Sequence, residues 1–90
     1  MNETIGKLVE STKGRDNGKI YMIYSSTSKS VTLVDGDARR IVNPKVKNIK
    51  HIKFLDMQSD IIKNKILDNR KVFDSEIYSF IKNFKNTLKF

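Results

Sequence analysis

The chain has 90 residues, a formal net charge of +8 and 38% hydrophobic residues, which fit one small domain with a modest core. It contains no cysteine and a single histidine, so disulfides, zinc fingers, thiolate catalysis and histidine-paired catalytic triads are excluded. No segment has the roughly 18 apolar residues of a membrane span, and the N-terminal residues lack a signal-peptide pattern.

The N-terminal half predicts short strands separated by turns. Five segments contain the β-branched, aromatic or alternating residues typical of strands: 5–12, 19–25, 31–34, 39–42 and 47–54. The loop 13–18 (KGRDNG) contains two glycines, Gly14 and Gly18, which favour a turn. The dipeptides Asp35-Gly36 and Asn43-Pro44 are turn signals on either side of the fourth segment. This pattern favours a small antiparallel barrel or sandwich. Tyr21 and Tyr24 belong either to its core, the commoner role, or to a platform for unpaired bases.

The C-terminal third changes to a helical period. Ser59 and Asp60 predict the start of a helix that ends near Asn69, and Asp74 or Ser75 is expected to cap a second helix. The second helix has an apolar stripe made of Ile77, Phe80, Ile81, Phe84 and Leu88. This stripe either packs on the sheet, which we favour, or binds a partner.

Basic residues are concentrated in the N-terminal half. Residues 1–53 contain 11 basic and 5 acidic residues, a net charge of +6, whereas residues 54–90 contribute +2. The segment 39–53 has six lysines and arginines together with His51, and no acidic residue. Such a stripe is typical of a surface that binds a polyanion, the alternative being a solvated face of a lysine-rich protein. Because compositional bias would spread lysines evenly, the asymmetry favours a binding surface.

Several of these segments also match the pattern of a known family. They are IGKLV (5–9), GRDNGK (14–19), Asp35-Gly36, Arg39-Arg40-Ile41 and NPKVKNIKHI (43–52). Together they resemble the KOW motif, and more specifically the small KOW-domain RNA-binding proteins related to large-subunit ribosomal protein fourteen of archaea and eukaryotes. Phe73 departs from this pattern, because we expect a serine or threonine helix cap at its position.

The resemblance implies a mainly β fold with α-helices. A five-stranded SH3-like antiparallel barrel would occupy residues 1–56, and two short helices in residues 57–90 would pack on it within a single domain. The loop between the first two strands would face RNA. Gly14 and Gly18 let the backbone of that loop approach a phosphate, although an ordinary tight loop is the alternative. Asp16 is a poor phosphate contact and is expected to hold Arg15 or the turn.

The candidate RNA-binding residues lie in this loop and in the basic stripe. They are Lys13, Gly14, Arg15, Asn17, Gly18, Lys19, Arg39, Arg40, Lys45, Lys47, Lys50 and His51. Lysine and arginine bind phosphate oxygens, and arginine also suits bidentate contacts. Neighbouring strand residues point to opposite faces, so only one of Arg39 and Arg40 would lie on the main surface. His51 is either a half-buried strand residue or an RNA contact, and no metal site is expected around a lone histidine.

Structured RNA is therefore the expected partner, in particular ribosomal RNA or the large ribosomal subunit, recognised through its phosphate backbone. The alternative is a protein-interaction module of the transcription or translation machinery, with an exposed apolar patch around Phe73, Phe84 or Phe90. DNA is a further possible partner, because phosphate contacts alone do not distinguish it from RNA and only the resemblance favours RNA. We expect a cytoplasmic protein with no enzymatic activity, cofactor, membrane partner or small-molecule substrate.

Overall fold

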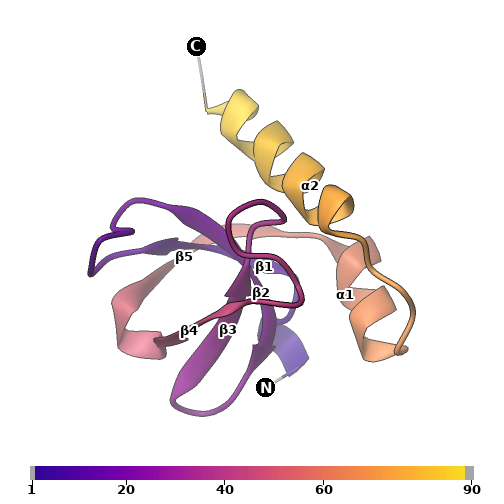
Figure 1. Cartoon of the computed structure of the whole chain (residues 1–90), viewed down its shortest axis with the longest axis horizontal. Coiled ribbons are helices and arrows are strands. Elements are labelled where there is room, and N and C mark those ends of the chain that lie inside the picture. Colours follow the sequence, from indigo (N-terminus) through magenta and orange to yellow (C-terminus); the bar gives the residue numbers. More distant parts are fainter. Residues whose placement is uncertain (1, 89–90) are drawn as a thin grey trace.

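Five strands form one antiparallel sheet in the computed structural model, which describes residues 2–88 (Figure 1). The elements in chain order are the 3₁₀ turn η1 (Asn2–Thr4), β1 (Lys7–Ser11), β2 (Ile20–Ser26), β3 (Ser30–Val34), β4 (Lys45–Asn48), the 3₁₀ turn η2 (Ile49–His51), β5 (Ile52–Gln58), α1 (Asp60–Leu67) and α2 (Asp74–Thr87). The spatial order is β4-β3-β2-β1-β5. This confirms the predicted antiparallel sheet of five strands and the two helices that follow it. Within residues 2–88 no ladder joins β4 to β5, so the sheet is open.

Both faces of the sheet are apolar. Leu8 pairs with Met22 and Val9 pairs with Tyr21 across the first two strands, so these two pairs lie on opposite faces. All four side chains are buried, which explains why the strands carry consecutive apolar residues instead of a strict alternation. Tyr21 is thus a core residue, and Tyr24 is half-buried against the same cluster as Met22.

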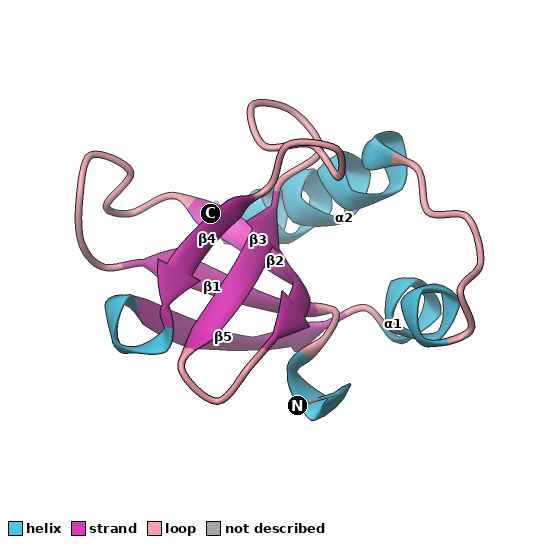
Figure 2. Cartoon of the chain, turned by 60° about the horizontal axis from the view of Figure 1, so that its bottom comes forward, coloured by secondary structure: helices cyan, strands magenta, loops and turns pink. Residues whose placement is uncertain are grey.

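The two helices pack on the face that carries Leu8 and Met22 (Figure 2). The buried side chains contributed by α1, α2 and the segment between them are Ile62, Val72, Ile77 and Ile81. The apolar stripe of α2 therefore packs on the sheet, as we favoured from the sequence, with Phe80 and Phe84 half-buried beside it. Leu88 lies outside this core, with 57% of its surface exposed.

Residues 39–42 were predicted as the fourth strand, but they belong to the long loop between β3 and β4. The carboxylate of Asp35 accepts the backbone N–H of Arg39 at 2.8 Å. The backbone N–H of Ile41 donates to the carboxylate of Asp74, at the start of α2, at 2.8 Å. Side chains therefore satisfy the backbone donors that a strand would place in a ladder.

The predicted strand 47–54 is interrupted by the turn η2, so it contributes to two strands. The side chain of Asn48 accepts the backbone N–H of Lys50 at 2.8 Å and begins the turn. A regular strand would place Ile49 and Ile52 on opposite faces, but both pack against the second core cluster. Residues three apart lie on the same side of a 3₁₀ turn, which the alternating pattern does not reveal.

The N-cap residue of helix α2 has no polar side chain. Phe73 occupies the N-cap position, and its backbone N–H donates to Glu76 at 2.9 Å. The other carboxylate oxygen of Glu76 accepts from Lys65 at 2.6 Å, and this hydrogen bond holds the pKa of Glu76 below its usual value. The prediction that Asp74 or Ser75 caps the helix is wrong, because both are helical residues. The carboxylate of Glu76 supplies the cap from within the first turn.

We expect Gly36→Ala to lower the free energy of unfolding by about 2–4 kcal/mol. Gly36 has a φ of +78°, and a Cβ there would contact the carbonyl oxygen of Asp74 and lie 2.8 Å from the backbone nitrogen of Tyr78. The substitution would therefore push α2 away from the sheet. Gly18→Ala is the matched control, because its φ is +91° but nothing lies within 4 Å of the added Cβ. Urea unfolding should show a loss of about 1 kcal/mol for the control, and equal losses would contradict the role of the α2 contact.

Candidate nucleic-acid interface

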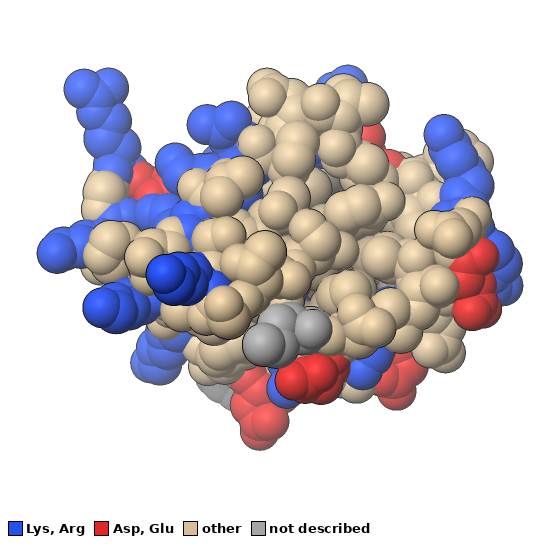
Figure 3. Space-filling view, turned by 90° about the horizontal axis from the view of Figure 1, so that it is seen from below, with Lys and Arg blue, Asp and Glu red and all other residues tan. Residues whose placement is uncertain are grey.

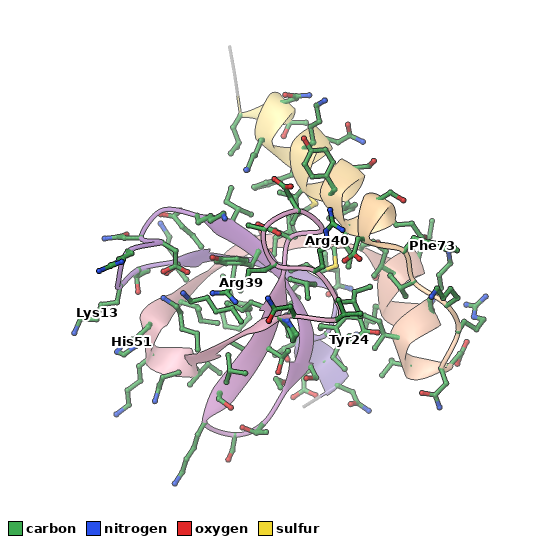
Figure 4. All side chains as sticks on the ribbon, in the orientation of Figure 1. Lys13, Tyr24, Arg39, Arg40, His51 and Phe73 are labelled. Atoms are coloured by element: carbon green, nitrogen blue, oxygen red, sulfur yellow. The ribbon has the colours of Figure 1, made fainter. Side chains whose placement is uncertain are left out.

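The loop between β1 and β2 and the turn η2 meet at one end of the sheet. The backbone N–H of Thr12 donates to the carbonyl of His51 at 2.9 Å. Lys13 and His51 accordingly lie close together at the left of Figure 4. Lys13, Arg15, Lys50 and Lys53 are exposed around this junction, and His51 is half-buried. We call these five residues the basic end; lysines and arginines gather there in Figure 3.

Tight backbone geometry shapes the loop at this end. The N–H of Gly18 donates to the carbonyl of Ser11 at 2.7 Å, and the N–H of Lys19 donates to the carbonyl of Asp16 at 2.8 Å. Gly14 and Gly18 have φ values of +89° and +91°, as their place in a turn predicts. Within residues 2–88, the backbone N–H groups at positions 13–15 have no acceptor, so they are available to an anion.

The carboxylate of Asp16 lies at the centre of a polar network beneath the loop. One oxygen accepts from the hydroxyl of Ser11 at 2.9 Å and from the ammonium of Lys47 at 2.8 Å. The other oxygen accepts from the hydroxyl of Tyr21 at 2.8 Å and lies 3.4 Å from the ammonium of Lys45. Asp16 therefore holds the turn, one of the two roles expected for it, and it also pairs with two lysines of β4.

Burial and hydrogen bonding have opposite effects on the acidity of Asp16. Burial alone would raise the pKa of its carboxyl group, but hydrogen bonds from Lys47 and from two hydroxyls outweigh it, and the pKa lies well below its usual value. Burial and the bond to Asp16 raise the pKa of Tyr21 far above its usual value. Asp16 is thus a permanent anion and Tyr21 a permanent donor at neutral pH.

Three of the predicted RNA-binding lysines have carboxylate partners inside the protein. Lys45 and Lys47 pair with Asp16, and the ammonium of Lys19 lies 3.4 Å from the carboxylate of Asp35. The side chain of Lys47 is only 9% exposed, and its ammonium also donates to the carbonyl of Lys13 at 2.6 Å. These lysines position the loop and the strands, and their charges are largely compensated.

The structure places Arg39 and Arg40 in the loop between β3 and β4, so the strand argument for their opposite directions does not apply. Arg40 is exposed, lies beside α2 in Figure 4, and donates from Nε to the carbonyl of Asp37 at 3.3 Å. Arg39 is half-buried and lies between Arg40 and the basic end. The predicted surface is therefore divided, with Arg40 away from the loop that carries Lys13.

Lys29 is a neighbour of the basic end that the sequence did not single out. It is exposed in the loop between β2 and β3, and its carbonyl accepts the backbone N–H of Ile49 at 3.0 Å. This bond places Lys29 beside the turn η2. The sequence shows a lysine in a polar serine-rich loop, but only the pairing of β3 with β4 brings it to this end.

No family model and no curated protein matches the chain. Among residues 2–88, no helix is long and apolar enough to cross a membrane, and no group of three histidine, aspartate or glutamate side chains is arranged to hold a metal ion. What the site can do therefore rests on its geometry and charge. It offers exposed cations and free backbone N–H groups at one end of the sheet.

We expect Asp16→Asn to lower the free energy of unfolding by about 2–4 kcal/mol, because it leaves the buried ammonium of Lys47 without a counter-charge. Urea unfolding at pH 7 provides the measurement. Asp37→Asn is the matched control, because Asp37 is exposed and its side chain takes part in none of the ion pairs among residues 2–88. A loss that is no larger for Asp16→Asn than for the control would refute the central role of the network.

The stability difference between the wild-type protein and Asp16→Asn should depend on pH. The pKa of Asp16 is lower in the folded protein than in the unfolded chain, where it is about 3.9, so its contribution is complete above that value. The contribution is lost as the pH falls below about 4 toward the folded pKa. Urea titrations between pH 7 and pH 2 should show the two proteins converging, and a constant difference would contradict this assignment.

Proposed function

We propose that this protein binds structured RNA, with ribosomal RNA the leading candidate, through the phosphate backbone. The observation that carries the proposal is the basic end, where Lys13, Arg15, Lys50 and Lys53 are exposed. Within residues 2–88 none of these four side chains forms an ion pair, whereas other lysines of the same half do. Uncompensated cations on one surface are the feature that a polyanion needs.

The loop supports the same proposal through its backbone. The free N–H groups at positions 13–15 and the side chains of Lys13 and Arg15 belong to one loop tip. Backbone N–H groups and basic side chains are the usual donors to phosphate oxygens. Recognition would then depend on the shape of the RNA backbone rather than on base sequence, with Asn17 as a further donor on the exposed loop.

The architecture is compatible with the KOW resemblance, and we propose an SH3-like barrel for residues 1–56 on that basis. The support is the antiparallel order β4-β3-β2-β1-β5 and the turn η2 that connects the two edge strands. In this arrangement the first loop lies beside η2, as the proposed RNA surface requires. We further propose that the protein acts in the cytoplasm, without enzymatic activity, on or near the large ribosomal subunit.

A protein-interaction role is the second candidate, favoured by the exposure of Phe73. This ring is 58% exposed between the two helices, whereas Phe84 is half-buried in the core and Phe90 lies outside the described residues. The two functions differ in salt dependence. Co-sedimentation with ribosomes that disappears at high salt supports RNA contacts, and binding that persists supports the apolar surface.

We expect RNA affinity to fall with salt at a slope of about −3 to −5 on a log–log plot, as for about four to six neutralised phosphates. The double variant Arg15→Ala/Lys50→Ala should reduce the steepness of this slope by about 2. Arg70→Ala/Lys71→Ala removes the same charge from the segment between the helices and should leave the slope close to that of the wild type. Filter binding of a ribosomal RNA fragment at several salt concentrations measures the slope for each variant. Equal changes of slope in the two double variants would contradict the assignment of the binding surface to the basic end.

A further inference from the structure

A small pocket of about 300 Å³ opens on β5, beyond the basic end. Its lining residues are Lys7, Leu8, Phe54, Asp56, Met57 and Gln58. Strand β5 leaves the turn η2 at Ile52 and reaches the pocket at Phe54, so the pocket lies a short way along β5 from the turn that carries Lys50, although the side chain of Lys53 points to the opposite face from Phe54. A volume of this size is at the lower limit for small-molecule sites and suits a single planar group.

The pocket results from an irregularity in the pairing of β1 with β5. Lys7 pairs with Gln58 and Val9 pairs with Phe54, so β5 uses two more residues than β1 over this stretch. Asp56 lies in the middle of the bulge with a φ of +57°, a left-handed conformation that is uncommon outside glycine and that aspartate and asparagine adopt more readily than other residues. Bulges of this kind redirect side chains and are frequent beside functional sites.

The pocket combines an exposed aromatic ring with polar groups. Phe54 is 43% exposed, and the ammonium of Lys7 lies 5.7 Å from the centre of its ring. Within residues 2–88, the carboxylate of Asp56 has no hydrogen-bond or ion-pair partner. The pocket therefore offers a face for stacking, a cation and a free acceptor next to one another.

We propose that this pocket binds one unpaired nucleobase of the RNA whose phosphates contact the basic end; the inference rests on the proposed function. Phe54 would stack on the base, Lys7 would lie near a flanking phosphate, and Asp56 would accept hydrogen bonds from the edge of the base. A carboxylate only accepts hydrogen bonds, so a base with adjacent N–H donors, such as guanine, fits best. An apolar protein side chain would instead leave the Asp56 carboxylate and the Lys7 ammonium without partners.

The test compares two RNA hairpins that differ only at a single-nucleotide bulge, one with a guanosine and one with an abasic residue. Wild-type protein should bind the guanosine hairpin about 5- to 150-fold more tightly, the range expected for stacking of one base on an aromatic ring. Phe54→Ala should lose most of the difference between the two hairpins, and its affinity for the guanosine hairpin should approach that of the wild type for the abasic one. Phe54→Tyr should keep the difference, which distinguishes lost stacking from misfolding.

Phe73→Ala is the matched control, because Phe73 is also an exposed ring with a lysine ammonium nearby, that of Lys71 at 5.5 Å, but it lies outside the pocket. It should keep the full preference for the guanosine hairpin. Asp56→Asn, which tolerates the same φ, should bind a bulged guanosine less tightly and a bulged uridine unchanged.

The outcomes separate the two proposals. Equal affinity of the wild type for both hairpins would overturn the proposal that the pocket binds a nucleobase and would favour a protein side chain as its ligand. The proposed RNA binding by the basic end would not be affected by that result. No salt-sensitive binding to either hairpin or to the ribosomal RNA fragment would overturn the proposed function itself. Loss of the preference in Phe73→Ala would also count against the pocket.

Discussion

The carboxylate of Asp16 is the contact on which this end of the molecule depends. It receives hydrogen bonds from Ser11 of β1, Tyr21 of β2 and Lys47 of β4, and strand β3 separates β4 from the neighbouring pair β1 and β2 in the sheet. The side chain of Lys47 is only 9% exposed, and its ammonium needs such a partner because an isolated buried charge is costly. The network therefore fixes the loop tip relative to β4. It also turns the single acid of the loop inward, so that the outward side chains of this loop are basic or neutral.

The distribution of acids separates two roles among the basic residues of the N-terminal half. Lysines that face Asp16 or Asp35 are part of the framework, whereas those around the first loop and the turn η2 are exposed and form no ion pair within residues 2–88. The strand β5 then connects that surface to the bulge that carries Phe54 and Asp56. A nucleic acid lying along β5 would meet cations first and an aromatic ring next. In this arrangement, contacts to the phosphate backbone would position the nucleic acid, and the pocket would contact one of its bases.

Much of the framework could be predicted from local patterns, and the failures have physical causes. The glycines of the first loop, the buried run around Tyr21 and the stripe of α2 from Ile77 to Phe84 each carry a local signal that agrees with the structure, whereas Leu88 at the end of the stripe lies outside the core. The residue types of segment 39–42 favour a strand. In the structure, however, the backbone N–H groups of Arg39 and Ile41 donate to the carboxylates of Asp35 and Asp74 instead of to a neighbouring strand. The latter contact spans 33 positions in sequence, and no local pattern reports it. The partners of Asp16 were missed for the same reason, since Lys47 reaches it only through the pairing of β4 with β3.

The hydrogen bond between Ile41 and Asp74, and the close fit of Gly36 beneath the first turn of α2, also constrain the order of assembly. A chain is synthesised from its N-terminus, and the loop that leads into β4 appears long before α2 does. Until the last third of the chain emerges, the donor at Ile41 has no acceptor and the apolar face around Leu8 and Met22 has no cover. The nascent sheet thus lacks one covering layer until the two helices have been synthesised, because α1 and α2 both contribute to this core and Asp74 of α2 supplies the acceptor for the loop.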